Sequence, residues 1–142
     1  MKASELRIGN LVNVDNPIFS DLKDIPLKII GIKLRDEPLF PNSNSVISFT
    51  DPKNFWEISQ FNEFIKPIQL TEEWKFKFGF EKTEWDNFNS HRLSVGDNDY
   101  AIVLYSDGNC EVGDIITCKI EYVHQLQNLY FSLVAEELTF KK

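Results

Sequence analysis

The chain has 142 residues, of which 42% are hydrophobic and 26% are charged, and its formal net charge is −7. This size and composition are typical of a soluble globular protein with one domain or two small ones. No apolar run approaches the roughly 18 residues that a membrane-spanning helix needs, and the N-terminal residues lack the apolar core of a signal peptide. We therefore expect a cytoplasmic protein, away from membranes, with reduced cysteines.

The negative charge is concentrated in the second half of the chain. Residues 1–70 carry 8 basic and 9 acidic side chains, a net charge of −1, whereas residues 71–142 carry 7 and 13, a net charge of −6. Such a surface repels phosphate backbones, which argues against nucleic acid as a partner.

The first half predicts several short strands. In residues 8–14, Val12 and Val14 share one face, and Asp15-Asn16-Pro17 ends the strand. A second strand covers residues 26–34, and its apolar alternation switches faces beside Gly31, which predicts a β-bulge. Further strands are expected at 46–49, 55–58 and 61–68. Short strands joined by polar loops predict a small curled sheet or barrel over residues 1–70.

The opening Arg7-Ile8-Gly9-Asn10-Leu11-Val12-Asn13-Val14 resembles the Gly-Asp-x-Val-x-Val start of SH3-like barrels. In that pattern the glycine makes a tight turn into the strand and alternate valines point inward. Asn10 stands where the usual acid would be. The resemblance implies an SH3-like β subdomain.

The second half begins with a short predicted helix that we expect to join the halves as a hinge. Thr71 is placed as its N-cap and Gly79 as its C-terminal stop, and Trp74 and Phe78 form its buried stripe. We expect residues 71–142 to form a second, α+β subdomain, or the two parts to form one continuous domain.

An antiparallel meander should follow, with strands at 88–95, 100–106 and 115–120, and with Asn109 to Val112 pairing back on the 100–106 strand. Asp107-Gly108 predicts a two-residue hairpin that places Tyr105 opposite Cys110, and Gly113-Asp114 predicts the next turn. A helix over 122–134 would pack on this β-β-β unit, and Glu136–Phe140 is expected to return as a last strand.

The 122–134 helix supplies the candidate binding site. Its apolar residues share one broad sector, but Phe131 falls on the opposite, polar side near His124, Gln127 and Asn128. Either another part of the chain covers Phe131, or His124, Gln127, Asn128 and Phe131 form a partner-binding patch.

Residues suited to catalysis or metal binding are sparse. Cys110 and Cys118 lie on neighbouring strands without Cys-x-x-Cys spacing, which favours structural thiols over a zinc site. His91 could meet Asp97 or Asp99 across its hairpin, but that loop is equally explained as a solvated acidic turn. No phosphate-binding glycine loop or hydrolase motif occurs. We expect no catalytic residues, no metal and no cofactor.

Three blocks carry a resemblance to a family: Met1 to Val12, Ile68 to Phe80, and Tyr122 to Phe131 followed by Glu136-Glu137-Leu138. In that order they resemble a family of short, uncharacterised bacterial and prophage proteins. The resemblance implies a phage or mobile-element setting, in which small acidic proteins are often modulators of host proteins. Ala135 stands where relatives often have glycine.

Two hypotheses follow. The first is a non-enzymatic accessory protein that binds a protein partner and modulates a host protein. The second is a nucleic-acid or nucleotide-binding module that stacks bases on Phe19, Phe40, Phe55 and Trp56 of the N-terminal part. A hydrolase or nuclease is a third, weaker alternative.

Overall fold

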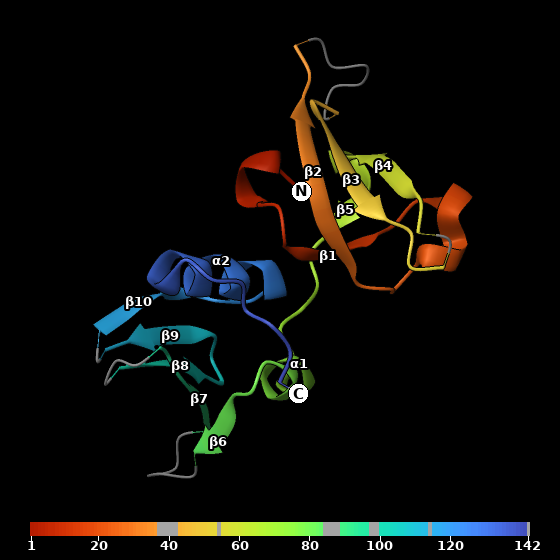
Figure 1. The fold of residues 1–142 in the computed structure, drawn as a ribbon. Coiled ribbons are helices and arrows are strands. Elements are labelled where there is room, and N and C mark those ends of the chain that lie inside the picture. The colour runs from red at the N-terminus through yellow and green to blue at the C-terminus, as the bar shows by residue number, and fades with distance from the viewer. Residues whose placement is uncertain (37–42, 54, 84–88, 97–99, 114, 142) are drawn as a thin grey trace. The chain divides into compact units, whose positions relative to one another are not determined.

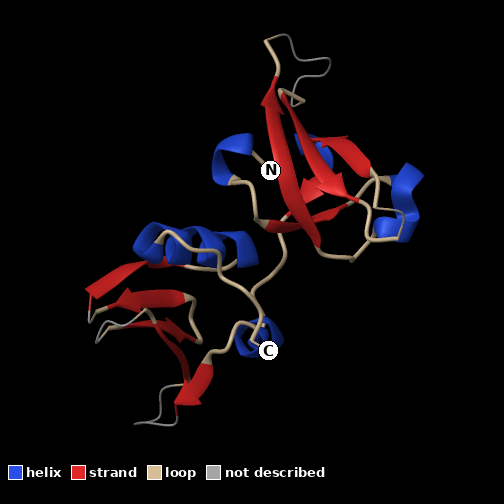
Figure 2. Ribbon diagram, in the orientation of Figure 1, coloured by secondary structure: helices blue, strands red, loops and turns tan. Residues whose placement is uncertain are grey.

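The computed structural model describes residues 1–36, 43–53, 55–83, 89–96, 100–113 and 115–141, without the side chains of residues 116 and 117. It contains two antiparallel five-stranded sheets and a C-terminal helix (Figures 1 and 2), which confirms the α+β class. The chain separates into two compact units, Met1–Ile68 and Gln69–Lys142. No helix in the described part of the chain is long and apolar enough to cross a membrane.

Unit 1 is built on a sheet with the strand order β4-β3-β2-β1-β5, in which neighbours are antiparallel. Its strands are β1 (Leu11–Val14), β2 (Leu27–Leu34), β3 (Ser45–Thr50), β4 (Glu57–Phe61) and β5 (Ile65–Lys66). Its short 3-10 helices are η1 (Ala3–Glu5), η2 (Pro17–Leu22) and η3 (Asn62–Phe64). Within the described ranges β4 and β5 do not pair, so the sheet does not close into a barrel.

The core of unit 1 follows the alternation predicted from the sequence. Val12 and Val14 are both buried. The predicted bulge is confirmed, because the β2–β3 register shifts between Ile29 and Gly31. The shift leaves Ile30 as an extra, exposed residue of β2 and keeps Ile29 inside. The buried apolar side chains are Leu6, Val12, Val14, Leu22, Leu27, Ile29, Ile47, Phe49 and Ile65.

The strand expected over 61–68 is wrong, because η3 separates β4 from the two-residue β5. Buried Asn62 accounts for this interruption. Its Nδ2 donates to the Met1 carbonyl at 3.1 Å, and its Oδ1 accepts from the Ser45 N–H at 3.3 Å. The amide side chain thus joins the N-terminus to β3, which favours a turn over continued pairing.

Unit 2 contains the second sheet, with the order β10-β9-β8-β7-β6, and α2 lies along one face of it (Figure 1). Its strands are β6 (Glu81–Thr83), β7 (Ser90–Ser94), β8 (Ala101–Tyr105), β9 (Asn109–Val112) and β10 (Ile115–Lys119). Its helices are α1 (Glu72–Lys77) and α2 (Val123–Val134). Of these strands, β6 is the one that the sequence pattern did not predict.

The hairpin between β8 and β9 is one residue out of the predicted register. Leu104, and not Tyr105, pairs with Cys110. The loop has three residues and ends on Gly108 at φ +86°, a left-handed conformation that suits glycine and the three-residue type of hairpin. Since a one-residue shift exchanges the faces of a strand, Leu104 and Cys110 are both buried.

The predicted last strand at Glu136–Phe140 does not form. The segment packs on α1 instead: the Lys141 N–H donates to the Lys77 carbonyl at 2.8 Å, and the Phe140 ring lies 5.3 Å from the Phe78 ring. α1 begins as predicted, with Thr71 Oγ1 accepting from the Trp74 N–H at 3.5 Å. The tail is thus held against α1 by one backbone hydrogen bond and by ring contacts, without a neighbouring strand.

Candidate functional site

The structure distributes the four predicted binding residues of α2 between the interior and the surface. His124 and Gln127 are each 2% exposed, whereas Asn128 and Phe131 are half-buried. The expectation that His124 and Gln127 face solvent is corrected by this burial. The buried face of the helix runs through Val123, His124, Leu126 and Gln127, so a partner could reach only Asn128 and Phe131 of the proposed patch.

The first residues of α2 explain how the helix is held in this orientation. Gln125 Oε1 accepts from the backbone N–H groups of Glu121 at 2.9 Å and Tyr122 at 3.1 Å, which satisfies donors at the helix start. The Leu70 N–H donates to the Glu121 carbonyl at 2.9 Å. The Tyr122 ring stacks on the His124 ring, with 5.9 Å between centroids. The start of α2 is thus fixed by hydrogen bonds at Glu121 and Tyr122.

His91 occupies a second polar cluster, at the contact between α1 and the sheet. Its Nε2 lies 3.1 Å from Glu72 Oε1, and Lys82 Nζ lies 3.3 Å from the same oxygen. The carboxylate can only accept, so neutral His91 carries its proton on Nε2. Asp97 and Asp99, the predicted partners of His91, lie outside the described residues.

His91 lies in a largely buried environment and is 5% exposed. Burial lowers the pKa of His91, and the positive charge of Lys75 lowers it further. The Phe76 ring covers the imidazole edge-on at 5.4 Å. Nδ1, which would supply the lone pair of a general base, is buried without a hydrogen-bond partner in the described structure.

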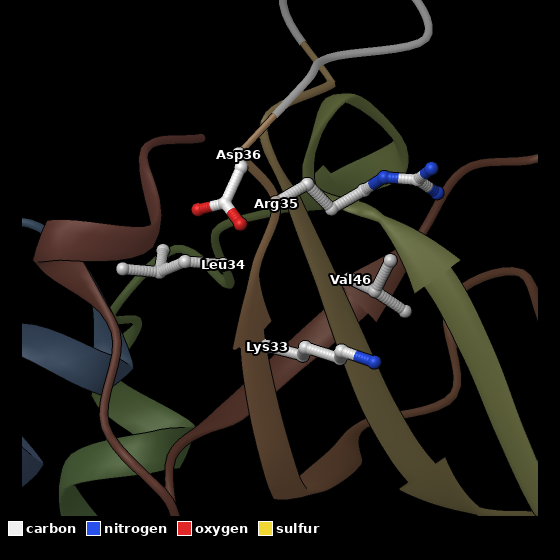
Figure 3. A pocket seen from close by; sticks show the side chains of 5 residues that line it. All are labelled: Lys33, Leu34, Arg35, Asp36 and Val46. Atoms are coloured by element: carbon white, nitrogen blue, oxygen red, sulfur yellow. The ribbon is translucent and has the colours of Figure 1, made fainter.

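A hollow of about 640 Å³ lies at the end of β2 in unit 1 (Figure 3). Lys33, Arg35 and Val46 lie on one side of the strand, and Leu34 and Asp36 lie on the other (Figure 3). The Arg35 guanidinium is placed over the Phe61 ring, 5.9 Å from its centroid. Among the described lining residues the charged groups point to opposite sides of the strand (Figure 3).

The most prominent exposed apolar feature of unit 1 is a pair of adjacent aromatic residues, which we call the aromatic pair. Phe55 is 82% exposed and Trp56 is 75% exposed. They follow the turn between β3 and β4, where the Asp51 N–H donates to the Trp56 carbonyl at 2.7 Å. The Phe55 N–H donates to the Asp51 carbonyl at 2.9 Å. Backbone hydrogen bonds therefore join Asp51 to both residues of the aromatic pair.

Two further contacts brace this turn. Asp51 Oδ1 accepts from the Lys53 N–H at 2.7 Å, and Lys53 Nζ lies 3.5 Å from Asp21 Oδ2 on η2. Phe55 has a φ of +58°, a left-handed conformation that bulky residues rarely adopt. The strain is of the order of 1–3 kcal/mol for such a residue. No burial of the Phe55 ring within the described structure offsets it.

The sequence pattern indicated these rings as stacking candidates, but it did not predict that both would be exposed. The sequence did contain an indication of this exposure. Consecutive residues of a strand, as predicted for 55–58, point to opposite faces, so Phe55 and Trp56 cannot both enter one core. Of the other stacking candidates, Phe19 packs partly against the core of unit 1, and Phe40 lies outside the described residues.

The described residues hold no group of three or more His, Cys, Asp or Glu side chains arranged for a metal ion. Comparison with protein-family models, with curated proteins and with solved structures finds no match for this chain.

Proposed function

We propose that this chain is a non-enzymatic accessory module that binds a protein partner through the aromatic pair. The observation that carries the proposal is the exposure of Phe55 and Trp56 on a hydrogen-bonded turn. Large aromatic side chains supply most of the binding energy at many interfaces, and tryptophan is the most enriched of them. The backbone hydrogen bonds between Asp51 and the pair also lower the ordering entropy that association must overcome.

The partner that fits is a protein with an apolar cleft for two rings and a basic rim. Glu57 is exposed directly after Trp56, so a basic group at the rim of the cleft would face its carboxylate. Charge complementarity of this kind speeds encounter and selects among partners. A host protein modulated in the cytoplasm of a phage-bearing cell is consistent with the resemblance of the three sequence blocks to prophage proteins.

The fold proposal for unit 1 is an open relative of the SH3-like barrel. The strand order β4-β3-β2-β1-β5 and the 3-10 helix η3 between β4 and β5 support it. Gly9 at φ +97° and the buried valines of β1 also agree with the opening motif. In this scheme the aromatic pair sits on the β3–β4 connection of a small binding module.

Site-specific photo-crosslinking in the source cells tests the function. A photoreactive phenylalanine analogue placed at Trp56 should crosslink to one protein, which mass spectrometry identifies. The same analogue at Ile115, which is 68% exposed in unit 2, is the matched control and should not capture that protein. Crosslinking that is equal at both positions would overturn the proposal.

The purified partner then allows a quantitative test by calorimetric titration. The double variant Phe55→Ser/Trp56→Ser removes both rings and should weaken binding at least about 30-fold, because interface hot spots contribute about 2 kcal/mol or more. Ile115→Ser should leave the affinity unchanged. If the double variant binds with unaltered affinity, the aromatic pair is not the binding site, and Asn128 and Phe131 of α2 become the next candidates.

Nucleic-acid binding is the second candidate, favoured by the same exposed rings, since bases stack on aromatic side chains. The near-neutral residues 1–70 supply little of the basic groove that normally accompanies such stacking. Electrophoretic shift titrations with single-stranded DNA and RNA at low salt decide between the candidates. A shift that Phe55→Ser/Trp56→Ser abolishes would favour nucleic acid over a protein partner.

A further inference from the structure

The two cysteines of unit 2 lie directly opposite each other on neighbouring strands. In the β9–β10 hairpin Ile115 pairs with Val112 and Ile116 pairs with Glu111. The register then shifts, and Cys118 pairs with Cys110. Both residues are present as thiols and not as a disulfide.

The β-bulge is what creates this pairing. Continuation of the regular register would place residue 117 opposite Cys110 and Cys118 opposite Asn109. The shift between Ile116 and Cys118 inserts one extra residue into β10, and the two cysteines become cross-strand partners. Sequence spacing alone would have assigned them to different faces of the hairpin.

The geometry of such a pair suits a disulfide. Directly opposed residues of antiparallel strands have Cα atoms about 4.5–5.5 Å apart, within the roughly 4.4–6.8 Å range of natural disulfides. The two thiols also differ in access. Cys118 is exposed on β10, which is the edge strand of its sheet, whereas Cys110 is fully buried.

We propose that Cys110 and Cys118 form a redox-active dithiol that is oxidised by peroxides. The Cys118 thiolate attacks one peroxide oxygen, the O–O bond breaks, and Cys118 becomes a sulfenic acid while hydroxide leaves. Cys110 then loses its proton and attacks the Cys118 sulfur, which forms the S–S bond and releases the sulfenic oxygen as water. In total two thiols lose two electrons and two protons, and one hydrogen peroxide is reduced to two waters.

The Cys110–Cys118 disulfide would link the edge strand β10 covalently to β9. The inference is independent of the aromatic pair, since both cysteines lie in unit 2 and Phe55 and Trp56 lie in unit 1. It assigns the exposed thiol as the peroxide-reactive group and the buried thiol as the resolving group.

Treatment of the purified full chain with hydrogen peroxide tests the proposal. Intact mass spectrometry should show a monomer lighter by two hydrogen atoms, and non-reducing peptide mapping should join Cys110 to Cys118. The matched control Cys118→Ser/Lys119→Cys moves the exposed thiol one position along β10, opposite Asn109. Its side chain points to the other face, so its intramolecular disulfide should form at least about tenfold more slowly.

Two single variants test the assigned roles. Cys110→Ser should stop at the sulfenic acid, which a dimedone probe traps on Cys118. Cys118→Ser should leave the buried Cys110 unreacted on the same timescale. Over-oxidation of wild-type Cys118 with Cys110 unchanged, or disulfides formed only between molecules, would overturn the proposal.

Discussion

The His91 Nε2 atom lies 3.1 Å from Glu72 Oε1, and this contact joins β7 to the first turn of α1. Lys82 of β6 reaches the same carboxylate oxygen at 3.3 Å. A short helix of six residues cannot be stable by itself, so α1 depends on such contacts and on its aromatic neighbours. The cluster therefore links the stability of unit 2 to pH.

We predict that the stability of unit 2 falls as the pH is lowered below about 6.5, the ordinary pKa of histidine. Burial, and then the charge of Lys75, lowers the pKa of folded His91. The unfolded state therefore binds the proton more readily, and stability is lost as the pH falls toward the folded-state pKa. Urea unfolding between pH 7.5 and pH 5 measures this loss.

His91→Gln is the control for this pH dependence, because glutamine can donate to Glu72 but does not titrate. The variant should show a smaller slope of unfolding free energy against pH over the same range. Equal slopes for the variant and the wild type would show that other groups cause the dependence. Glu72, whose pKa is lowered chiefly by its hydrogen bond to Lys82, acts only at more acidic pH, below about 4.5.

The second prediction concerns the orientation of α2. Replacement of buried His124 by alanine leaves a cavity beside the Tyr122 ring and should lower the free energy of unfolding by about 1–3 kcal/mol. Ser132→Ala, at an exposed position of the same helix, should change it by less than about 0.5 kcal/mol. Chemical denaturation of both variants compares them. If both variants change the free energy of unfolding by less than about 0.5 kcal/mol, His124 lies at the surface and the prediction is wrong.

The third prediction tests the cap of α2. Gln125→Ala removes the oxygen that accepts from the N–H groups of Glu121 and Tyr122, and should destabilise the fold by about 1 kcal/mol. Gln125→Glu keeps an accepting oxygen and adds a negative charge near the positive end of the helix, so stability should be retained. A loss of the same size in both variants would refute the capping role.

The fourth prediction concerns strain in the aromatic pair. Phe55→Gly relieves the left-handed backbone at φ +58° and should raise the free energy of unfolding by up to about 1 kcal/mol, because the exposed ring contributes little burial. Trp56 has no positive φ to relieve, so Trp56→Gly should leave the free energy of unfolding unchanged or lower it. Thermal unfolding of the two variants provides the comparison, and a destabilised Phe55→Gly would mean that the ring packs on the protein.

The sequence by itself determined the features that arise from neighbouring residues. Alternation put Val12 and Val14 inside, Gly31 marked the bulge of β2, and Thr71 marked the start of α1. Each depends on local backbone preference or on the two-residue period of a strand. The α+β class follows from the same local patterns.

The tertiary structure alone decided which faces and registers were used. The Leu104–Cys110 pairing required a three-residue loop, and the Cys110–Cys118 pairing required an extra residue in β10. His124 and Gln127 are buried, and the distant residue Leu70 holds the start of their helix through a hydrogen bond to Glu121. In the 136–140 segment no strand forms, and Phe140 packs against the rings of Trp74 and Phe78. These outcomes depend on competition between contacts far apart in the chain, and local propensity carries no information about that competition.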